Sequence, residues 1–537
     1  MRPKNMNNAL LKTRLLLAAM VAVASLTATA HAAAPGITGG SGATATFNLV
    51  AQPAFLNQPD GASVYSWGYG CSAAPAGFAP SSISPGTVGC PGMQVPGPTL
   101  IVTEGQTVTV NLTNGLPAAA GNTSILFPGF NVTTTGGVAG LLTQEALPAG
   151  TVTYSFVASS PGTRAYYSGT QGDLQVDMGL YGAVIVLPAS VPSTCSTGLP
   201  AANPGGNMKA QAKWGEPDAR LSAAAYDNAK TCYDREYLFQ FSEMDANIHN
   251  QALAQVTALA GCTAGAAGCS LSVPTEPYHP SYFMINGRSM PDDMDPNYAI
   301  EYPHQPYNGN PHMHPGEQVL IRVIGQGRWQ HPFHEHANHV RILARDGNLI
   351  LSASDPNSLA GPLLFTTTTT PGLAFDGIFY FTGRGLNWDM YGHNPTSSDS
   401  QATLTCTPDA DGYNTGSPTA INYFEWCQDH NKPLQVAPFG DVASGGPATL
   451  PDPDIFTNGV WYSGSPYLGP DATTRATGPN STFLPANFQG NPANERGWAF
   501  MWHSHNEREI TTNNVFPGGM MMMMLVDSRE FVIDEQN

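Results

Sequence analysis

The sequence predicts an all-β protein of β-sandwich domains, and three observations support this fold class. Gly 57 and Pro 46 make up about a fifth of the 537 residues, which favours short strands joined by turns. Runs such as residues 107–113 and 151–157 alternate polar and apolar side chains with the period of a strand. The chain is also too long for one ordinary hydrophobic core, so we expect two sandwiches rather than one.

Residues 1–32 are typical of a secretory signal peptide. Basic residues within positions 2–14 precede an apolar run over 15–26, and Ala30-His31-Ala32 fits a cleavage site. We therefore expect an exported protein in the periplasm, at the cell surface or outside the cell. No later apolar run reaches the roughly 18 residues that a membrane helix needs, so no membrane span is expected.

The mature chain divides by composition into two domains and a linker. Residues 33–190 contain the first series of short strands, and residues 191–229, rich in Ala, Pro and Gly, are typical of a linker. Residues 230–537 are expected to form the second domain. Within it, residues from about 353 to 495 are rich in Pro, Gly, Ser, Thr and Asp, which indicates a long insertion. A small third domain in this region is the alternative.

Eight cysteines follow one another in couples along the mature chain. An even number of cysteines in an exported chain favours disulfides formed in an oxidising compartment, although spacing alone leaves other connectivities open. We expect the pairs Cys71–Cys90, Cys195–Cys232, Cys262–Cys269 and Cys406–Cys427.

The net charge of −18 would repel a nucleic acid and attract metal cations. Solubility of an exported protein explains the same charge more simply. The sequence carries no nucleophile elbow, Gly-rich phosphate loop, zinc-protease motif or basic stripe, so hydrolase, nucleotide and nucleic-acid functions are not expected.

Two histidine motifs carry the chemistry of the second domain. They are His331-Pro-Phe-His334-Glu-His336 and His503-Ser-His505. Histidines two residues apart on a strand point to the same face of a sheet, where neutral imidazoles can converge on a metal ion. One such pair is weak evidence, but two in one all-β domain predict a metal site.

These motifs resemble those of the multicopper oxidases. The first, followed by Val340-Arg-Ile-Leu-Ala-Arg-Asp-Gly, resembles the segment that gives one histidine to each class of copper in that family. Residues 502–507, Trp-His-Ser-His-Asn-Glu, resemble its carboxy-terminal His-Cys-His motif, and residues 162–169 and 178–186 resemble the end of its first domain. The resemblance implies cupredoxin-like Greek-key sandwiches, copper as cofactor and oxidoreductase activity. Two such domains carrying these motifs would make the chain similar to the two-domain laccases, in which adjacent subunits complete the copper site, so a homo-oligomer is one arrangement to consider.

The sequence also departs from the family at most copper ligands. The family's first two His-x-His pairs align with residues 126–129, Leu-Phe-Pro-Gly, and 167–169, Tyr-Ser-Gly, which we expect to face the histidine motifs of the second domain without offering an imidazole. Ser504 replaces the type-1 cysteine, and Glu509 and Asn514 align with the type-1 histidine and the axial methionine. A blue copper centre requires a thiolate, so no type-1 site is expected.

The candidate metal ligands that remain are His334, His336, His503 and His505, with His331 alone at the type-1 position. Four imidazoles suit one Cu(II) or Zn(II) ion; manganese is an alternative if the neighbouring carboxylates take part. A vestigial, hydrogen-bonded polar cluster is the alternative to a metal site. We expect the run Met520–Met524 to pack in the core, with Cu(I) binding by thioethers as the alternative. His304, His312 and His314 are expected at the surface.

Two functions remain open at this point. One is a copper-dependent oxidoreductase with an altered site, acting on a small reductant or on metal ions. The other is a non-catalytic metal-binding or cell-envelope protein that kept the fold without oxidase chemistry. The sequence does not decide whether the protein is an enzyme.

Overall fold

The computed structural model describes residues 34–80, 83, 85–193, 195, 223–314, 317–381, 407–408, 416, 464–468, 496–527 and 533. Its described residues are mostly strands with few helices, so the predicted all-β fold class is confirmed. The predicted signal peptide, most of the predicted linker, Cys406 and Cys427 lie outside the described residues. Among the helices that are described, none is long and apolar enough to cross a membrane.

The first domain is a sandwich of two five-stranded sheets. The inner sheet has the order β11-β12-β5-β1-β4, with bounds Gly162–Tyr167, Tyr181–Leu187, Leu100–Thr103, Gly36–Thr38 and Gly77–Ala79. The outer sheet has the order β3-β2-β6-β10-β7, with bounds Ser63–Cys71, Thr44–Asn57, Thr107–Asn114, Thr151–Val157 and Thr133–Gly136. The short strands β8 (Val138–Ala139) and β9 (Gln144–Glu145) pair beside them, and α2 (Gly172–Gln175) precedes β12.

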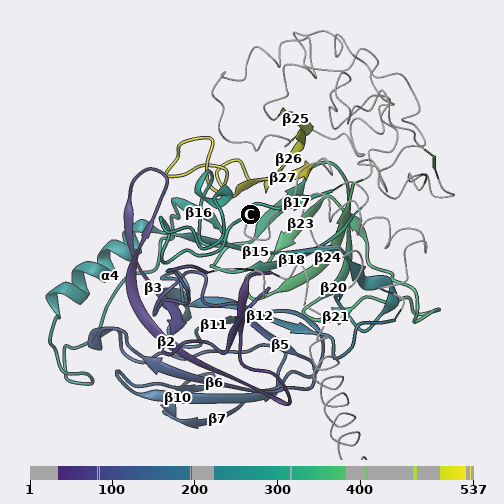
Figure 1. Cartoon of the computed structure of the whole chain (residues 1–537). Helices are drawn as coiled ribbons and strands as arrows, with labels where there is room; N and C mark the ends of the chain where they lie inside the picture. The colour runs from purple at the N-terminus through teal and green to yellow at the C-terminus, as the bar shows by residue number, and fades with distance from the viewer. Residues whose placement is uncertain are drawn as a thin grey trace, which may run out of the picture.

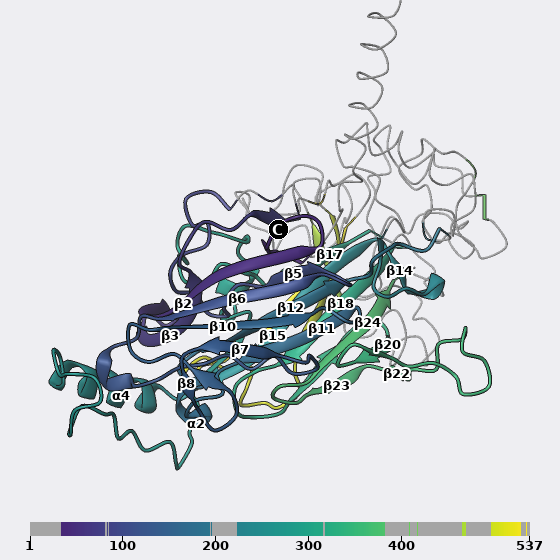
Figure 2. The same cartoon turned by 90° about the horizontal axis from the view of Figure 1, so that it is seen from below.

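Alternation along the strands places the core of this first sandwich. In β6, Val108, Val110 and Leu112 are buried, while Thr109 and Asn111 between them are half-buried. A side chain on every second residue of a strand points to the same face, so one apolar face per sheet closes the core. The outer sheet is seen in Figure 2 as a layer of strands lying side by side.

The second domain is a larger sandwich whose two sheets share a second apolar core. Its inner sheet has the order β16-β15-β18-β24-β20-β21, with bounds Tyr282–Ile285, Arg235–Met244, Gln318–Gly325, Ala374–Tyr380, Val340–Arg345 and Asn348–Leu349, and β22 (Leu363–Leu364) pairs with β20. Its outer sheet has the order β17-β27-β26-β19-β23, with bounds His312–Met313, Met521–Asp527, Arg496–Ser504, His331–Glu335 and Thr366–Thr369, and β25 (Gly464–Leu468) pairs with β26.

The start of the predicted insertion belongs to this sandwich. β23 pairs with β19, and β24 pairs with both β18 and β20, so residues 366–380 contribute strands to both sheets. The run of four threonines in β23 has the β-branched side chains that suit a strand. Composition alone concealed these strands because Thr is common in both loops and sheets.

The two inner sheets pack against each other, which gives four layers of strands. Ile101, Ala183 and Ile185 of the first domain share an apolar cluster with Leu238 and Ile324 of the second. Figure 1 shows the layers in sequence, from β10 and β7 at one side to β26 and β27 at the other. The outer sheet of the second domain is therefore the layer farthest from the first domain.

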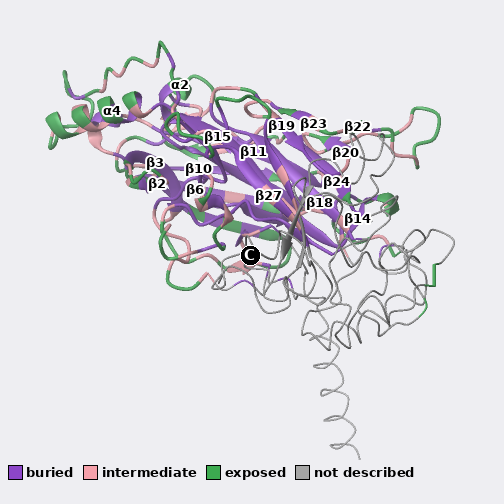
Figure 3. Ribbon diagram, turned by 90° about the horizontal axis from the view of Figure 1, so that it is seen from above, coloured by how far each residue is buried: buried purple, intermediate pink, exposed green. Residues whose placement is uncertain are grey.

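One helix of the second domain reaches back across the interface. α4 (Ala246–Ala258) begins after Asp245, whose side chain accepts a hydrogen bond from the backbone of Asn247, as an N-cap residue does. Its buried residues Ile248 and Ala252 join the core of the first domain, and Figure 1 shows α4 beside β3. The rest of the helix is largely exposed in Figure 3, whereas the strands are buried.

Three of the four predicted disulfides are confirmed. Cys71–Cys90, Cys195–Cys232 and Cys262–Cys269 are bonded. The second of these joins the start of the predicted linker to β14 (Cys232–Tyr233), which pairs with β13 (Ala223–Ala224). Both cysteines of the fourth predicted pair, Cys406–Cys427, lie outside the described residues.

Candidate metal centre

Three of the predicted histidines converge on one face of the outer sheet of the second domain. His334 of β19 pairs directly with His503 of β26, and His336 follows β19 by one residue. One nitrogen of each of these three imidazoles lies within 4.8 Å of the others. Nε2 of His336 and Nε2 of His503 are 3.3 Å apart. Two chain segments more than 160 residues apart in sequence thus bring their imidazoles together by strand pairing.

His505 lies at the edge of this group. Its ring centroid is 4.9 Å from that of His334 and 5.6 Å from that of His503. It is exposed, whereas the other three are buried. A small molecule would therefore reach a metal ion held by the three buried imidazoles from the side of His505.

The surroundings of the group favour neutral imidazoles. Burial, together with the neighbouring imidazoles of His503 and His505, lowers the pKa of His334 to about 4. Burial also lowers the pKa of His503. Neutral imidazole is the form that binds a metal ion, because the lone pair is then available.

Hydrogen bonds at Nδ1 of His503 and His334 determine which nitrogen of each imidazole faces the histidine group. Nδ1 of His503 lies 2.7 Å from the carbonyl oxygen of Ser504, which can only accept, so Nδ1 carries the proton and Nε2 keeps the lone pair. Nδ1 of His334 lies 2.7 Å from Oγ1 of Thr366. Such contacts orient imidazoles and fix their tautomers in metal sites.

This donor set fits one transition-metal ion. Zinc–nitrogen bonds of about 2.0–2.1 Å place two donor atoms at most about 4 Å apart around one ion, so only a small inward movement of the rings is needed. Imidazole suits copper and zinc, whereas manganese prefers oxygen ligands. Among the described residues, these three histidines form the one such group of potential ligands.

His331 does not belong to this group, although the sequence suggested it as a ligand. It lies on β19 with its side chain toward the core of the sandwich, on the opposite face of the sheet from His334. Its Nε2 is 2.9 Å from Oε2 of Glu243, and its Nδ1 is 2.9 Å from Oε2 of Glu509. The two carboxylates bind opposite edges of the ring and do not converge with it on one point.

The place expected for type-1 copper is therefore filled by an ion-paired imidazolium. Burial alone would lower the pKa of His331, but hydrogen bonds to Glu243 and Glu509 outweigh burial and raise the pKa to about 9. The hydroxyl of Ser504 donates to Glu509, which holds that carboxylate against the imidazole. Asn514, aligned with the axial ligand, is instead exposed at a positive φ of 64° and lies outside this cluster.

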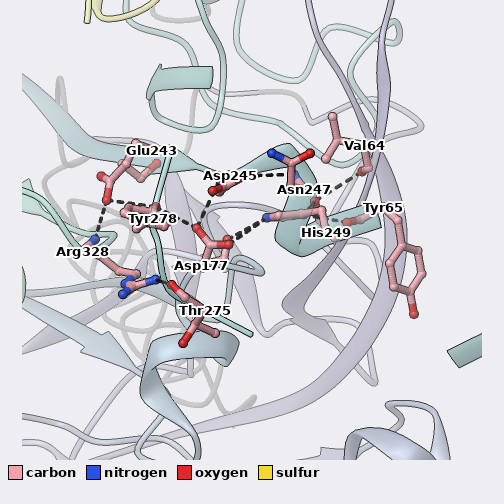
Figure 4. A network of polar contacts seen from close by, with 12 residues as sticks. Val64, Tyr65, Asp177, Glu243, Asp245, Asn247, His249, Thr275, Tyr278 and Arg328 are labelled. Atoms are coloured by element: carbon pink, nitrogen blue, oxygen red, sulfur yellow. Dashed lines mark hydrogen bonds and ion pairs between the residues drawn. The ribbon is translucent and has the colours of Figure 1, made fainter. Parts of the chain in front are cut away.

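Glu243 connects this cluster to the first domain. Its Oε1 accepts hydrogen bonds from the backbone of Arg328 and Trp329, and the hydroxyl of Tyr278 lies 3.2 Å away. The same hydroxyl is 2.7 Å from Oδ1 of Asp177, across the domain interface. Figure 4 shows this chain of contacts running from Glu243 through Tyr278 and Asp177 to His249.

Sequence reasoning missed Glu243 as a member of the site. The signal available was a glutamate inside the apolar segment 235–244, which becomes β15. A buried carboxylate needs a partner, but the sequence did not show that the partner would be His331, 88 residues away.

Two further expectations about histidines and lost ligands are wrong. His312 and His314 are 3% and 2% exposed and so are buried rather than at the surface. Residues 126–129 and 167–169 do not face the histidine group within one chain. Leu126 pairs with Tyr167, and Phe127 lies in the core of the first domain, on the far side of the inner sheets from the group.

The comparisons with known proteins agree with the sequence resemblance. Residues 83–190 match the family model described as multicopper oxidase. No curated protein sequence matches the chain.

Among solved structures, similarity is broad but remote. The multicopper oxidase mgLAC is 15% identical, with 91% of this chain and 87% of that chain covered and a TM-score of 0.44. The blue copper oxidase from Nitrosomonas europaea is 15% identical, with 90% and 85% covered and a TM-score of 0.42. A laccase from Botrytis aclada is 18% identical, with 64% and 47% covered and a TM-score of 0.36.

The match to residues 83–190 lies within the first sandwich of an all-β structure whose second sandwich carries the histidine motifs. The resemblance of this chain to the multicopper oxidases is thereby confirmed.

Proposed function

We propose that this protein is an exported copper-binding protein that holds one copper ion at His334, His336 and His503, with His505 at the open side. The observation that carries the proposal is the convergence of three buried imidazoles, each of which offers a nitrogen within 4.8 Å of the other two. When bound, copper would supply a redox-active Lewis acid at this face of the sheet.

The proposal excludes long-range electron entry of the laccase kind. That path needs a type-1 copper held by a thiolate, whereas Ser504 is a hydroxyl donor to Glu509 here. His331 is paired with two carboxylates instead of a metal. The site is therefore a mononuclear imidazole site without an attached blue copper centre.

Export is supported by the predicted signal peptide over residues 1–32 and by disulfides that form in an oxidising compartment. Copper is favoured over zinc by the family match, and over manganese by a donor set without oxygen ligands. We place the protein in the periplasm or outside the cell.

The test is the metal content of the mature protein purified without added metal and then titrated with Cu(II) under air. We expect about one copper per chain, lost in His336→Ala and His503→Ala. His339→Ala is the matched control, because His339 is close in sequence but contacts Phe365 and lies outside the group. Copper binding that is unchanged in His336→Ala and His503→Ala would refute the proposed site.

A second candidate is a copper-dependent oxidoreductase acting on a small reductant or a metal ion. The exposed position of His505 beside the buried group favours it, because a small molecule can reach that side. Dioxygen uptake by the copper-loaded protein with a small reductant, absent in His503→Ala, would support this function over a binding protein.

A further inference from the structure

The methionine run near the carboxy-terminal end divides between the two faces of the outer sheet. Met520, Met522 and Met524 lie in the core of the second sandwich, as expected from their role as adaptable apolar side chains. Alternation along β27 therefore points Met521 and Met523 to the opposite face. That face is the one that carries the histidine group.

Strand register places these thioethers next to the imidazoles. Met521 pairs directly with His503, and Met523 pairs with Met501 on the neighbouring strand β26. The backbone N–H of His336 donates to the carbonyl of Met501 at 3.3 Å, so Met501 is the cross-strand neighbour of His336. Directly opposed residues have Cβ atoms about 4.5–5.5 Å apart, within reach of a flexible methionine.

The face therefore presents two adjoining rows of ligand-type side chains. One row runs Met521, His503, His334, and the next runs Met523, Met501, His336. Met501 and Met523 are half-buried, while Met521 is buried at 4% exposure. Packing in the core of the sandwich accounts for Met520, Met522 and Met524, whereas Met501, Met521 and Met523 lie outside that core cluster.

We infer that this His–Met face is a binding site for monovalent copper, Cu(I), with Met501, Met521 and Met523 as the soft ligands beside His336 and His503. Thioethers are soft donors that select Cu(I), whereas imidazole serves copper in both oxidation states. Zinc and manganese gain little from thioethers, so the methionines would also bias the site toward copper. The inference rests on the proposed copper site and specifies the oxidation state that the site favours.

The experiment compares Cu(I) and Cu(II) binding in the mature full-length protein. Cu(I) affinity is measured anaerobically by competition with a chromogenic Cu(I) chelator, and Ag(I) serves as a soft monovalent probe that does not change oxidation state. The variant carries Met501→Leu, Met521→Leu and Met523→Leu together, because leucine nearly conserves the volume of methionine. The matched control is Met522→Leu in the core of the same strand.

We expect the triple variant to lose roughly tenfold to a hundredfold in Cu(I) affinity while Cu(II) affinity changes much less, and the control to keep both. If the triple variant keeps its Cu(I) affinity while Cu(II) binding still depends on His503, the Cu(I) inference is wrong but the proposed copper site stands. Failure of the wild-type protein to bind copper in either state would overturn the proposed function as well.

A second measurement guards against a variant that folds poorly. In wild-type protein with isotope-labelled methionine methyl groups, Ag(I) is expected to shift the signals of Met501, Met521 and Met523. The signals of Met520, Met522 and Met524 should stay in place because these side chains face the core. Ag(I) shifts confined to the core methionines, or absent from all six, would contradict the inference.

Discussion

The carboxylate of Glu509 lies 2.9 Å from Nδ1 of His331, where the resemblance to multicopper oxidases places a type-1 copper ion. The opposite nitrogen of the same ring lies 2.9 Å from Glu243. A protonated imidazole between two carboxylates supplies positive charge at this point without a metal. The histidines of the motif over residues 331–336 therefore have two different roles. His331 belongs to a buried ion-pair cluster, whereas His334 and His336 face a candidate metal site.

The first prediction is that the copper-loaded protein is not blue and that Ser504→Cys alone does not make it blue. A thiol at position 504 would still lie beside His331 and Glu509, which are paired with each other. A blue centre needs histidine nitrogens as well as the thiolate. The measurement is the visible spectrum after copper loading, and an intense thiolate-to-copper band in the single variant would refute this prediction.

The second prediction concerns the loss of one partner of the buried ion pair. Glu509→Ala leaves the His331–Glu243 pair without its second carboxylate in a site where both residues are almost fully buried. Removal of one partner from a buried pair costs about 3–5 kcal/mol, so we expect the free energy of unfolding to fall by about that much. Equilibrium denaturation near neutral pH measures it.

Glu507→Ala is the control for this variant. Glu507 is exposed and only two residues away, so its removal should change the free energy of unfolding by less than about 0.5 kcal/mol. Equal destabilisation by the two variants would show that the contact between Glu509 and His331 contributes nothing specific.

The sequence predicted the fold class, three disulfides and the histidine group, because each of these depends on local periodicity or on residue types that rarely occur by chance. Strand alternation alone placed His334 with His336 and His503 with His505, whereas the meeting of the two pairs was expected from the family resemblance and depends on the register of β19 and β26. Glu243 could not be placed beside His331, because β15 and β19 belong to different sheets and their side chains meet only when the two sheets pack together. The direction of Met521 also required the register of β26 and β27, which a run of identical residues does not reveal.

The third prediction is a loss of stability at alkaline pH that depends on His331. The pKa of His331 is about 9 in the folded protein, above the ordinary value of about 6.5 expected after unfolding. A group whose pKa rises on folding stabilises the protein fully below the unfolded value, and this contribution is lost as the pH rises through the folded value. We therefore expect the free energy of unfolding to fall between about pH 6.5 and pH 9, by roughly 3 kcal/mol.

His331→Gln tests the origin of that pH dependence. Glutamine cannot titrate, so the variant should be less stable at neutral pH but should lose the decline in this interval. Denaturant unfolding measured across the interval gives both slopes. A decline of the same size in wild type and His331→Gln would assign it to other groups.

The fourth prediction is that Thr366 positions His334 for metal binding. Oγ1 of Thr366 lies 2.7 Å from Nδ1 of His334, and β23 pairs with β19 at this point. If His334 binds copper through Nε2, its Nδ1–H donates to that hydroxyl, which fixes the ring and its tautomer. Thr366→Val keeps the shape and the strand but removes the acceptor, so we expect Cu(II) affinity to fall roughly tenfold with little change in stability.

Thr368→Val is the matched control, because Thr368 is on the same strand, is exposed and pairs with Pro332 rather than with a histidine. Isothermal titration with Cu(II) under the same conditions compares the two variants, and the proton signals of the imidazoles report the tautomer of His334 directly. A role limited to strand packing would leave copper affinity and tautomer unchanged in both variants. A positioning role requires that only Thr366→Val changes them, because only Thr366 holds a ring that faces the metal site.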